Sequence, residues 1–157
     1  MFIQKVKTCV NFNNINCFQC NIFTEKHYTI HYRFGDNIMK NNNLINDEIV
    51  ENANQRLLKQ VTKFCDDDKI LIVGDNHKII QNIIDNLPKK IQEKILFNNI
   101  QNPKHFASIE TEDELDFLFC DIINILQSTK IFFCGLGPGS GFAFFISLIG
   151  NKEYHRI

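Results

Sequence analysis

The sequence lacks any concentration of positive charge, and this absence excludes one class of function. Its 17 Lys and Arg are offset by 18 Asp and Glu, giving a net charge of −1, and the basic residues are scattered along the chain. A dedicated nucleic-acid-binding domain normally carries a basic face, so we expect no nucleic acid among the partners. Tryptophan is also absent, but 44% of the 157 residues are apolar, which is enough for one domain with an ordinary core.

The sequence also shows no paired set of zinc ligands, and we expect no secretory leader. Cys17 and Cys20 form a Cys-x-x-Cys motif, but a structural zinc site needs further ligands, and no second Cys-x-x-Cys follows. The opening residues, MFIQKVKTCVNFNN, contain no long apolar run of the kind found in signal peptides. We therefore expect no metal, and a cytoplasmic setting in which Cys65, Cys120 and Cys134 are free thiols that pack as small core residues.

Apolar periodicity predicts strands that alternate with helices. The expected strands cover residues 2–6, 27–34, 69–75, 95–97 and 130–134, and the expected helices cover residues 46–65, 76–87, 111–129 and 142–150. The last helix, FAFFISLIG, is apolar throughout and is expected to be buried. Such alternation is typical of an α/β, Rossmann-like three-layer domain with a mainly parallel sheet. We assign this domain to residues 27–157, after a short N-terminal segment of residues 1–26.

Three of the expected strands end in residues that could bind a ligand. The first ends in His31-Tyr32-Arg33-Phe34-Gly35-Asp36, the second in Gly74-Asp75, and the third in the loop Gly135–Gly141. His31 and Arg33 are two residues apart, so their side chains should point to the same face of the sheet. In a parallel sheet these strand ends share one edge, and open α/β sheets bind their ligands at that edge. The convergence of the three ends predicts a binding site.

The loop Gly135–Gly141, GLGPGSG, leads directly into the last expected helix. Glycines let the backbone approach a ligand closely, and the N–H groups of a helix N-terminus suit a phosphate. The loop matches neither GxGxxG nor GxxxxGK(S/T), so a tight strand-to-helix turn is an equal alternative. Arg33 offers a fork of donors that fits a phosphate, although a lone arginine at a strand end commonly forms a surface ion pair.

Two further sets of polar residues are interpreted as unrelated to this site. Asp66, Asp67 and Asp68 could hold a divalent metal that carries a sugar diphosphate, but they precede their strand and so belong to the opposite edge. We interpret them as a solvated turn. The remaining histidines have no metal-like spacing and are expected at the surface or in incidental positions: His27, His77, His105 and His155.

Taken in order, these motifs resemble the donor-binding domain of the fucosyltransferase superfamily, which includes the α1,2-, α1,6- and protein O-fucosyltransferases. The first family motif is a strand that ends in His-x-Arg before Gly-Asp, as at residues 31–36. Phe34 stands where the family often has a second arginine. The second motif is a strand that ends in a small residue and one or two acids, as at Gly74-Asp75, with Asn76 in place of a second acid.

The third family motif extends the resemblance over residues 27–150. It consists of an Asp-initiated helix, a strand, and a serine-containing loop with a nearby Phe, as at Asp121, residues 130–134, Ser140 and Phe142. The resemblance implies a fold like the C-terminal half of a GT-B glycosyltransferase.

The resemblance also implies an activity and a role for each matched residue. It implies a metal-independent enzyme that binds GDP-fucose or a related nucleotide sugar, with no other cofactor, and transfers the sugar with inversion to a hydroxyl of a glycan or protein. Arg33 would hold the β-phosphate and stabilise the leaving group, and Asp36 is the nearest acid by sequence for the general base. The other implied donor contacts are His31 and Asp121 near the guanine, Asp75 in the nucleotide pocket, and Gly137, Gly139, Ser140, Gly141 and Phe142 around the diphosphate.

Two alternatives to a complete enzyme stay open. Family members generally carry a further N-terminal region that helps to bind the acceptor, whereas residues 1–26 are all that precede the first motif. This difference leads us to expect a second chain or a homodimer at the acceptor side, or else a nucleotide-binding remnant without catalysis. The other alternative is membrane association through residues 131–150, which carry no charge and could just span a bilayer. The glycine and proline cluster inside that stretch argues against a spanning helix.

Overall fold

The computed structural model describes residues 21–33, 47–64, 68–75, 77–97, 112–135 and 141–157. The elements along them are β1 (His27–Arg33), α3 (Asp47–Val61), β2 (Lys69–Gly74), α4 (His77–Asp85), α5 (Lys89–Gln92), β3 (Ile95–Leu96), α6 (Glu112–Gln127), β4 (Lys130–Gly135), α7 (Gly141–Gly150) and β5 (Glu153–Arg156). The predicted alternation of strands and helices is therefore confirmed, while the strand expected at residues 2–6 lies outside the described residues.

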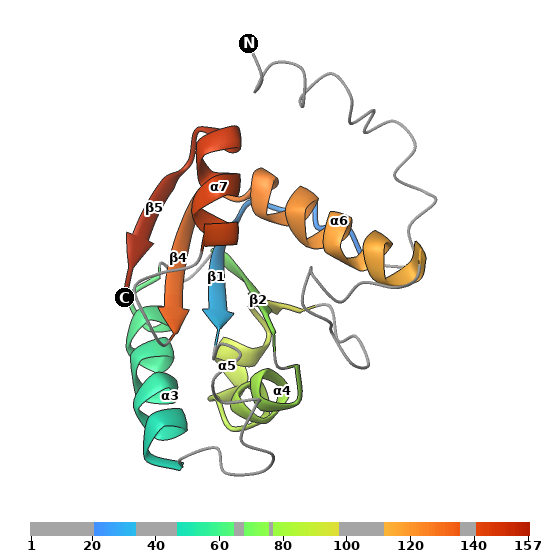
Figure 1. Ribbon diagram of the computed structural model, residues 1–157. Helices are drawn as coiled ribbons and strands as arrows, with labels where there is room; N and C mark the ends of the chain where they lie inside the picture. Colours follow the sequence, from blue (N-terminus) through green and yellow to red (C-terminus); the bar gives the residue numbers. More distant parts are fainter. Residues whose placement is uncertain (1–20, 34–46, 65–67, 76, 98–111, 136–140) are drawn as a thin grey trace.

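The described strands form a five-stranded sheet in the order β3-β2-β1-β4-β5, and every neighbouring pair is parallel (Figure 1). Strand β1 is central, and its residue His31 pairs with Val73 of β2 and with Phe133 of β4. The fold is thus an α/β domain with a Rossmann-like parallel sheet. Strand β5 is an element that periodicity missed, because Glu153–Arg156 is a largely exposed edge strand whose one apolar residue, Tyr154, gives no alternating pattern.

The order of the strands reverses between β1 and β4. From β1 the chain moves outward through β2 to β3, and it then returns to the other side of β1 to form β4 and β5 (Figure 1). Arg33, the last residue of β1, pairs at this reversal with Gly135, the last residue of β4. Ligands of open α/β sheets bind at the carboxyl ends of the strands that flank such a reversal. The edge at which the sequence predicts a site is therefore centred on these two residues.

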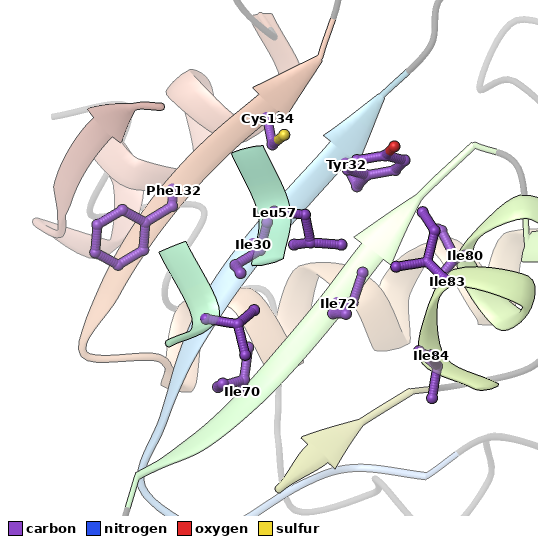
Figure 2. Close-up of a cluster of buried hydrophobic side chains, with 11 residues drawn as sticks. Ile30, Tyr32, Leu57, Ile70, Ile72, Ile80, Ile83, Ile84, Phe132 and Cys134 are labelled. Carbon is purple, nitrogen blue, oxygen red and sulfur yellow. The ribbon is translucent and has the colours of Figure 1, made fainter. Parts of the chain in front are cut away.

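Two hydrophobic clusters cover the two faces of the sheet. One joins Ile30 and Tyr32 of β1 to residues of α3 and α4, among them Leu57 (Figure 2). The other packs α6 and α7 against β2 and β4 through residues such as Ile125 and Ile146. The resulting three layers agree with the predicted architecture, in which alternate strand residues enter opposite layers.

The apolar helix α7 is buried along one side only. Ala143 and Ile146 are buried, whereas the side chains of Phe144, Phe145 and Leu148 are 50%, 54% and 55% exposed. The prediction of a buried helix is wrong, because α7 belongs to an outer layer and only one stripe of such a helix reaches the sheet. Residues 131–150 contain β4 and α7. No helix in the described part of the chain is long and apolar enough to cross a membrane.

Buried polar groups fasten the segment before β1 to helix α6. Asn124 is fully buried, and its Nδ2 donates to the carbonyl oxygen of Asn21 at 3.0 Å, while its Oδ1 accepts from the N–H of Phe23 at 2.8 Å. The ring nitrogens of His27, which is also fully buried, lie 2.9 Å from the carbonyl oxygen of Asn124 and 2.7 Å from that of Glu25. Of the two positions expected for His27, at the surface or incidental, the surface one is wrong, because backbone carbonyl groups provide its hydrogen-bond partners inside the fold.

The remaining histidine expectations have different outcomes. His77, the first residue of α4, is buried, and its ring centroid lies 4.9 Å from that of Phe97. The surface position, one of the two expected for His77, is therefore wrong, because the first residue of α4 packs against Phe97, which follows β3. His155 is exposed, as expected. His105 lies outside the described residues.

The structure corrects one of the cysteine expectations. Cys134 is a free, buried thiol, as expected. Cys120 is instead disulfide-bonded. A pairing of this kind depends on which segments the fold brings together, and the spacing of cysteines in one sequence does not reveal it. Because Cys120 is not a free thiol, it does not support the expected reducing setting.

Replacing Asn124 by Ala should destabilise the fold. The substitution removes the hydrogen bonds to the N–H of Phe23 and to the carbonyl of Asn21, both of which are partly buried, and each such bond contributes about 0.5–1.5 kcal/mol. We expect the free energy of unfolding in urea to fall by about 2 kcal/mol or more. Gln127→Ala, which removes an exposed amide from the same helix, should change it by less than about 0.5 kcal/mol. Equal effects of the two substitutions would contradict this role of Asn124.

Candidate functional site

Arg33 and Asp75 meet at the carboxyl edge of the sheet. Arg33 ends β1, and Asp75 directly follows β2, the strand beside it. Nε of Arg33 lies 3.7 Å from Oδ2 of Asp75, and the two side chains are 26% and 24% exposed. The contact is longer than the roughly 2.7–2.9 Å of a direct charge-assisted hydrogen bond. A pair of opposite charges thus stands at the predicted edge, and solvent reaches both members.

The glycines that end β2 and β4 lie tightly against the end of β1. A Cβ atom at Gly74 would overlap the carbonyl oxygen of Tyr32, and one at Gly135 would overlap the carbonyl oxygen of Arg33. The backbone on both sides of β1 is therefore too close for any residue with a side chain. These glycines allow the three strand ends to converge around Arg33, which gives a physical reason for the Gly74-Asp75 and Gly135 motifs.

His31 is buried on the face that carries α6 and α7. Its ring centroid lies 5.8 Å from that of Phe142 and 6.1 Å from that of Phe133, and its Nδ1 has no hydrogen-bond partner among the described residues. Burial, together with the nearby charge of Arg33, lowers the pKa of His31 to about 3. The imidazole is therefore neutral at ordinary pH, and its Nδ1 can donate or accept one hydrogen bond.

The structure brings together four of the residues predicted from the sequence. Arg33 contacts Asp75, His31 stands two residues before Arg33 on the same strand, and the ring of Phe142 lies beside that of His31. Gly141, the first residue of α7, is exposed and has open space where a Cβ would lie. The other residues predicted around the diphosphate, and the candidate base, lie outside the described residues: Gly137, Gly139, Ser140 and Asp36.

Asp121 lies on helix α6. Its side chain is partly buried, and no hydrogen bond or ion pair joins it to another described residue. Burial raises the pKa of Asp121 from 3.8 to about 7. Asp121 thus shares the α6/α7 layer with His31, but the structure does not link it to the Arg33–Asp75 pair.

A second polar group, on the α3 face of the same edge, was not predicted. The hydroxyl of Tyr32 donates to Oδ1 of Asn54 on α3 at 3.1 Å, and Cys134 pairs with Tyr32 in the sheet (Figure 2). Burial raises the pKa of Tyr32 and raises that of the Cys134 thiol to about 11, and Arg56 opposes both shifts. Cys134 is therefore an unreactive thiol. The sequence carries no signal for this group, because the contact depends on how α3 docks on the sheet.

A metal site is not found among the described residues. No group of three or more His, Cys, Asp or Glu side chains there is arranged to hold an ion. His27 and His31 are four residues apart on β1, but the ring nitrogens of His27 lie against two backbone carbonyls. Asp68 precedes β2, at the amino edge of the sheet, as expected for a turn, and Asp66 and Asp67 lie outside the described residues.

Comparison with known proteins gives no match to a family model, to a curated protein or to a solved structure. The fucosyltransferase resemblance, its GDP-fucose donor and its GT-B-like architecture therefore stay predictions from the ordered motifs.

Gly135→Ala should test the crowding around the end of β1. The added methyl group would collide with the carbonyl of Arg33, so the strand ends must separate. We expect the free energy of unfolding in urea to fall by about 1–3 kcal/mol, as for other overpacked sites. Gly141→Ala places a methyl group in open space within the first turn of α7 and should be neutral or stabilising by up to about 1 kcal/mol. A neutral effect of Gly135→Ala would show that the strand ends can adapt.

The pKa of Asp121 predicts a pH-dependent contribution to stability. Between about pH 4 and pH 7 the folded protein holds a proton on Asp121 that the unfolded chain has lost, so this residue stabilises the fold less as pH rises through that range. Asp121→Asn removes the titration. We expect Asp121→Asn to exceed the wild type in unfolding free energy at pH 8 by more than about 1 kcal/mol, and by much less at pH 4.

The pH comparison needs the variant and the wild type side by side. His31 has the opposite effect on the pH dependence of stability. Below about pH 6.5 its ring binds a proton in the unfolded chain but not in the folded protein, so its contribution to stability falls as pH falls. The difference between Asp121→Asn and wild type cancels that contribution. Asp85→Asn, at an exposed position, serves as the control. A constant difference between Asp121→Asn and wild type from pH 4 to pH 8 would contradict the raised pKa.

Proposed function

We propose that the edge around Arg33 binds a nucleotide sugar, and that the protein is a fucosyltransferase-like glycosyltransferase. The observation that carries this proposal is the position of Arg33, which ends β1 opposite Gly135 at the reversal of strand order. A partly exposed guanidinium in this place is suited to a phosphate. The ordered resemblance of the surrounding motifs to the fucosyltransferase superfamily supports GDP-fucose as the donor and a GT-B-like donor domain as the scaffold.

In this proposal Arg33 acts on the charge that develops when the sugar leaves. Breaking the bond between the sugar and the diphosphate adds negative charge to the β-phosphate, and a cation already in place stabilises that charge. Asp75, 3.7 Å away, restrains the guanidinium at the edge of the sheet. His31 is kept neutral by burial and by Arg33, so it can hydrogen-bond the donor without adding a second charge.

The remaining roles in the proposal come from the resemblance. The amides of residues 137–141 and the hydroxyl of Ser140 hold the diphosphate, so that no metal is needed, and Asp121 lies toward the guanine. Asp36 is the candidate base that takes a proton from the acceptor hydroxyl, and this role comes not from the resemblance but from its being the nearest acid in the sequence. The sugar passes with inversion to a glycan or protein, and a second chain or a homodimer completes the acceptor side.

Binding of GDP should depend on Arg33. In metal-free calorimetry we expect Arg33→Ala to weaken the binding of GDP at least about tenfold, or about 1.4 kcal/mol, because the mutation removes the cation that meets the phosphate. Lys59→Ala, in the last turn of α3, removes an exposed positive charge from the other end of the layer and should leave the affinity unchanged. No binding of GDP by the folded wild-type protein would overturn the proposed function.

Turnover separates an enzyme from a nucleotide-binding domain without catalysis. An enzyme consumes GDP-fucose and releases GDP in the presence of an acceptor hydroxyl, faster than by hydrolysis alone. A protein that binds GDP through Arg33, but releases none from GDP-fucose with any glycan or protein acceptor, would be the non-catalytic form of the same fold.

A further inference from the structure

Asp75 follows β2 at the carboxyl edge, next to the strand that carries Arg33. In dinucleotide-binding sheets that share this strand order, an acidic side chain after the first βα unit hydrogen-bonds a ribose hydroxyl, while the phosphate binds near the carboxyl end of the first strand. The 3.7 Å contact between Nε of Arg33 and Oδ2 of Asp75 shows that the two side chains reach the same point from neighbouring strands. A ligand held by Arg33 must therefore also meet the carboxylate of Asp75.

We propose that Asp75 accepts hydrogen bonds from the 2′- and 3′-hydroxyls of a ribose whose phosphate is held by Arg33, so that the site selects ribonucleotides over 2′-deoxyribonucleotides. The inference rests on the proposed function and goes beyond it, because it names the part of the nucleotide that the site reads and the residue that reads it.

The chemistry follows from the two opposite charges. A carboxylate repels a phosphate but offers two oxygens, with about four acceptor positions, to neutral donors. A guanidinium attracts a phosphate and offers only hydrogen-bond donors. Together, Arg33 and Asp75 favour a ligand that carries both an anion and neutral hydroxyl donors, and a nucleotide carries its 5′-phosphates and its 2′,3′-diol on one ribose. An isolated phosphate or diphosphate would meet Asp75 as a repulsive neighbour.

Two simpler roles for Asp75 make a different prediction. Asp75 could serve only to orient Arg33, or it could place a negative charge near the N-terminus of α4, which begins two residues later. Loss of Asp75 would then change stability, or change the affinity for every anionic ligand by a common factor. Neither role depends on the sugar hydroxyls, so discrimination between ribose and deoxyribose separates the proposal from both.

The test is a calorimetric comparison of GDP with 2′-deoxy-GDP, each titrated into the wild type and into Asp75→Ala. Wild type should bind GDP at least tenfold more tightly than 2′-deoxy-GDP, and Asp75→Ala should bring this ratio close to one. Removal of the repulsive carboxylate should also raise the affinity for 2′-deoxy-GDP, which is why the ratio, and not either affinity alone, is the readout. Asp85→Ala, which removes an exposed carboxylate from the far end of α4, should keep the wild-type ratio.

Each outcome supports or overturns a specific claim. A tenfold ratio in wild type and in Asp85→Ala that falls to about one in Asp75→Ala supports the proposal. A wild-type ratio near one, or a ratio that Asp75→Ala leaves intact, overturns it while leaving nucleotide-sugar binding through Arg33 standing. ADP and 2′-deoxy-ADP are measured in parallel. Ribose discrimination with ADP in the absence of any GDP binding would overturn the GDP donor and keep the ribose contact, and no binding of any of the four would overturn both.

Discussion

The parallel pairing of β1 with β2 on one side and with β4 on the other is the constraint on which the rest of the structure depends. It places β1 in the middle of the sheet and buries its alternate side chains in two different layers. It also carries the end of β1 to the reversal of strand order, where Arg33 lies between the ends of its two neighbours. Glycine at positions 74 and 135 is what lets these three ends approach so closely.

Burial decides which groups at this edge carry charge. His31, Tyr32 and Cys134 all lie inside the layers, and desolvation is the first cause of the pKa shift that keeps each of them neutral. Arg33 and Asp75, by contrast, are partly exposed to solvent at the carboxyl edge of the sheet. Arg33 and Asp75 therefore place one cation and one anion in contact at this edge. Such a dipole orients a ligand that has both an acidic and a neutral polar part more strongly than it attracts a simple ion.

The sequence predicted the layout of the fold because its strands and helices differ clearly in apolar period. The buried strands at 69–75 and 130–134 and the placing of His31 and Arg33 on one face are confirmed by β2, β4 and β1. The misses have a common origin in tertiary packing. The carbonyls around His27 come from α6 and from the segment before β1, and the docking of α3 brings Asn54 to Tyr32. The exposure of Phe144 and Phe145 likewise depends on which side of α7 meets the sheet, and an all-apolar segment does not reveal that side.

Placing the first strand at the centre of the sheet has a consequence for synthesis on the ribosome. Thr129, which hydrogen-bonds to the carbonyl of His27 just before β4, lies 102 residues further along the chain. During translation β1 is therefore synthesised well before β4. Until β4 is present, this edge of β1 is unpaired and can pair with other chains. Residues 27–33 therefore lack this partner strand until β4 has left the exit tunnel. The pairing of β1 with β4 thus joins residues that are made far apart in time, and it also forms the carboxyl edge around Arg33.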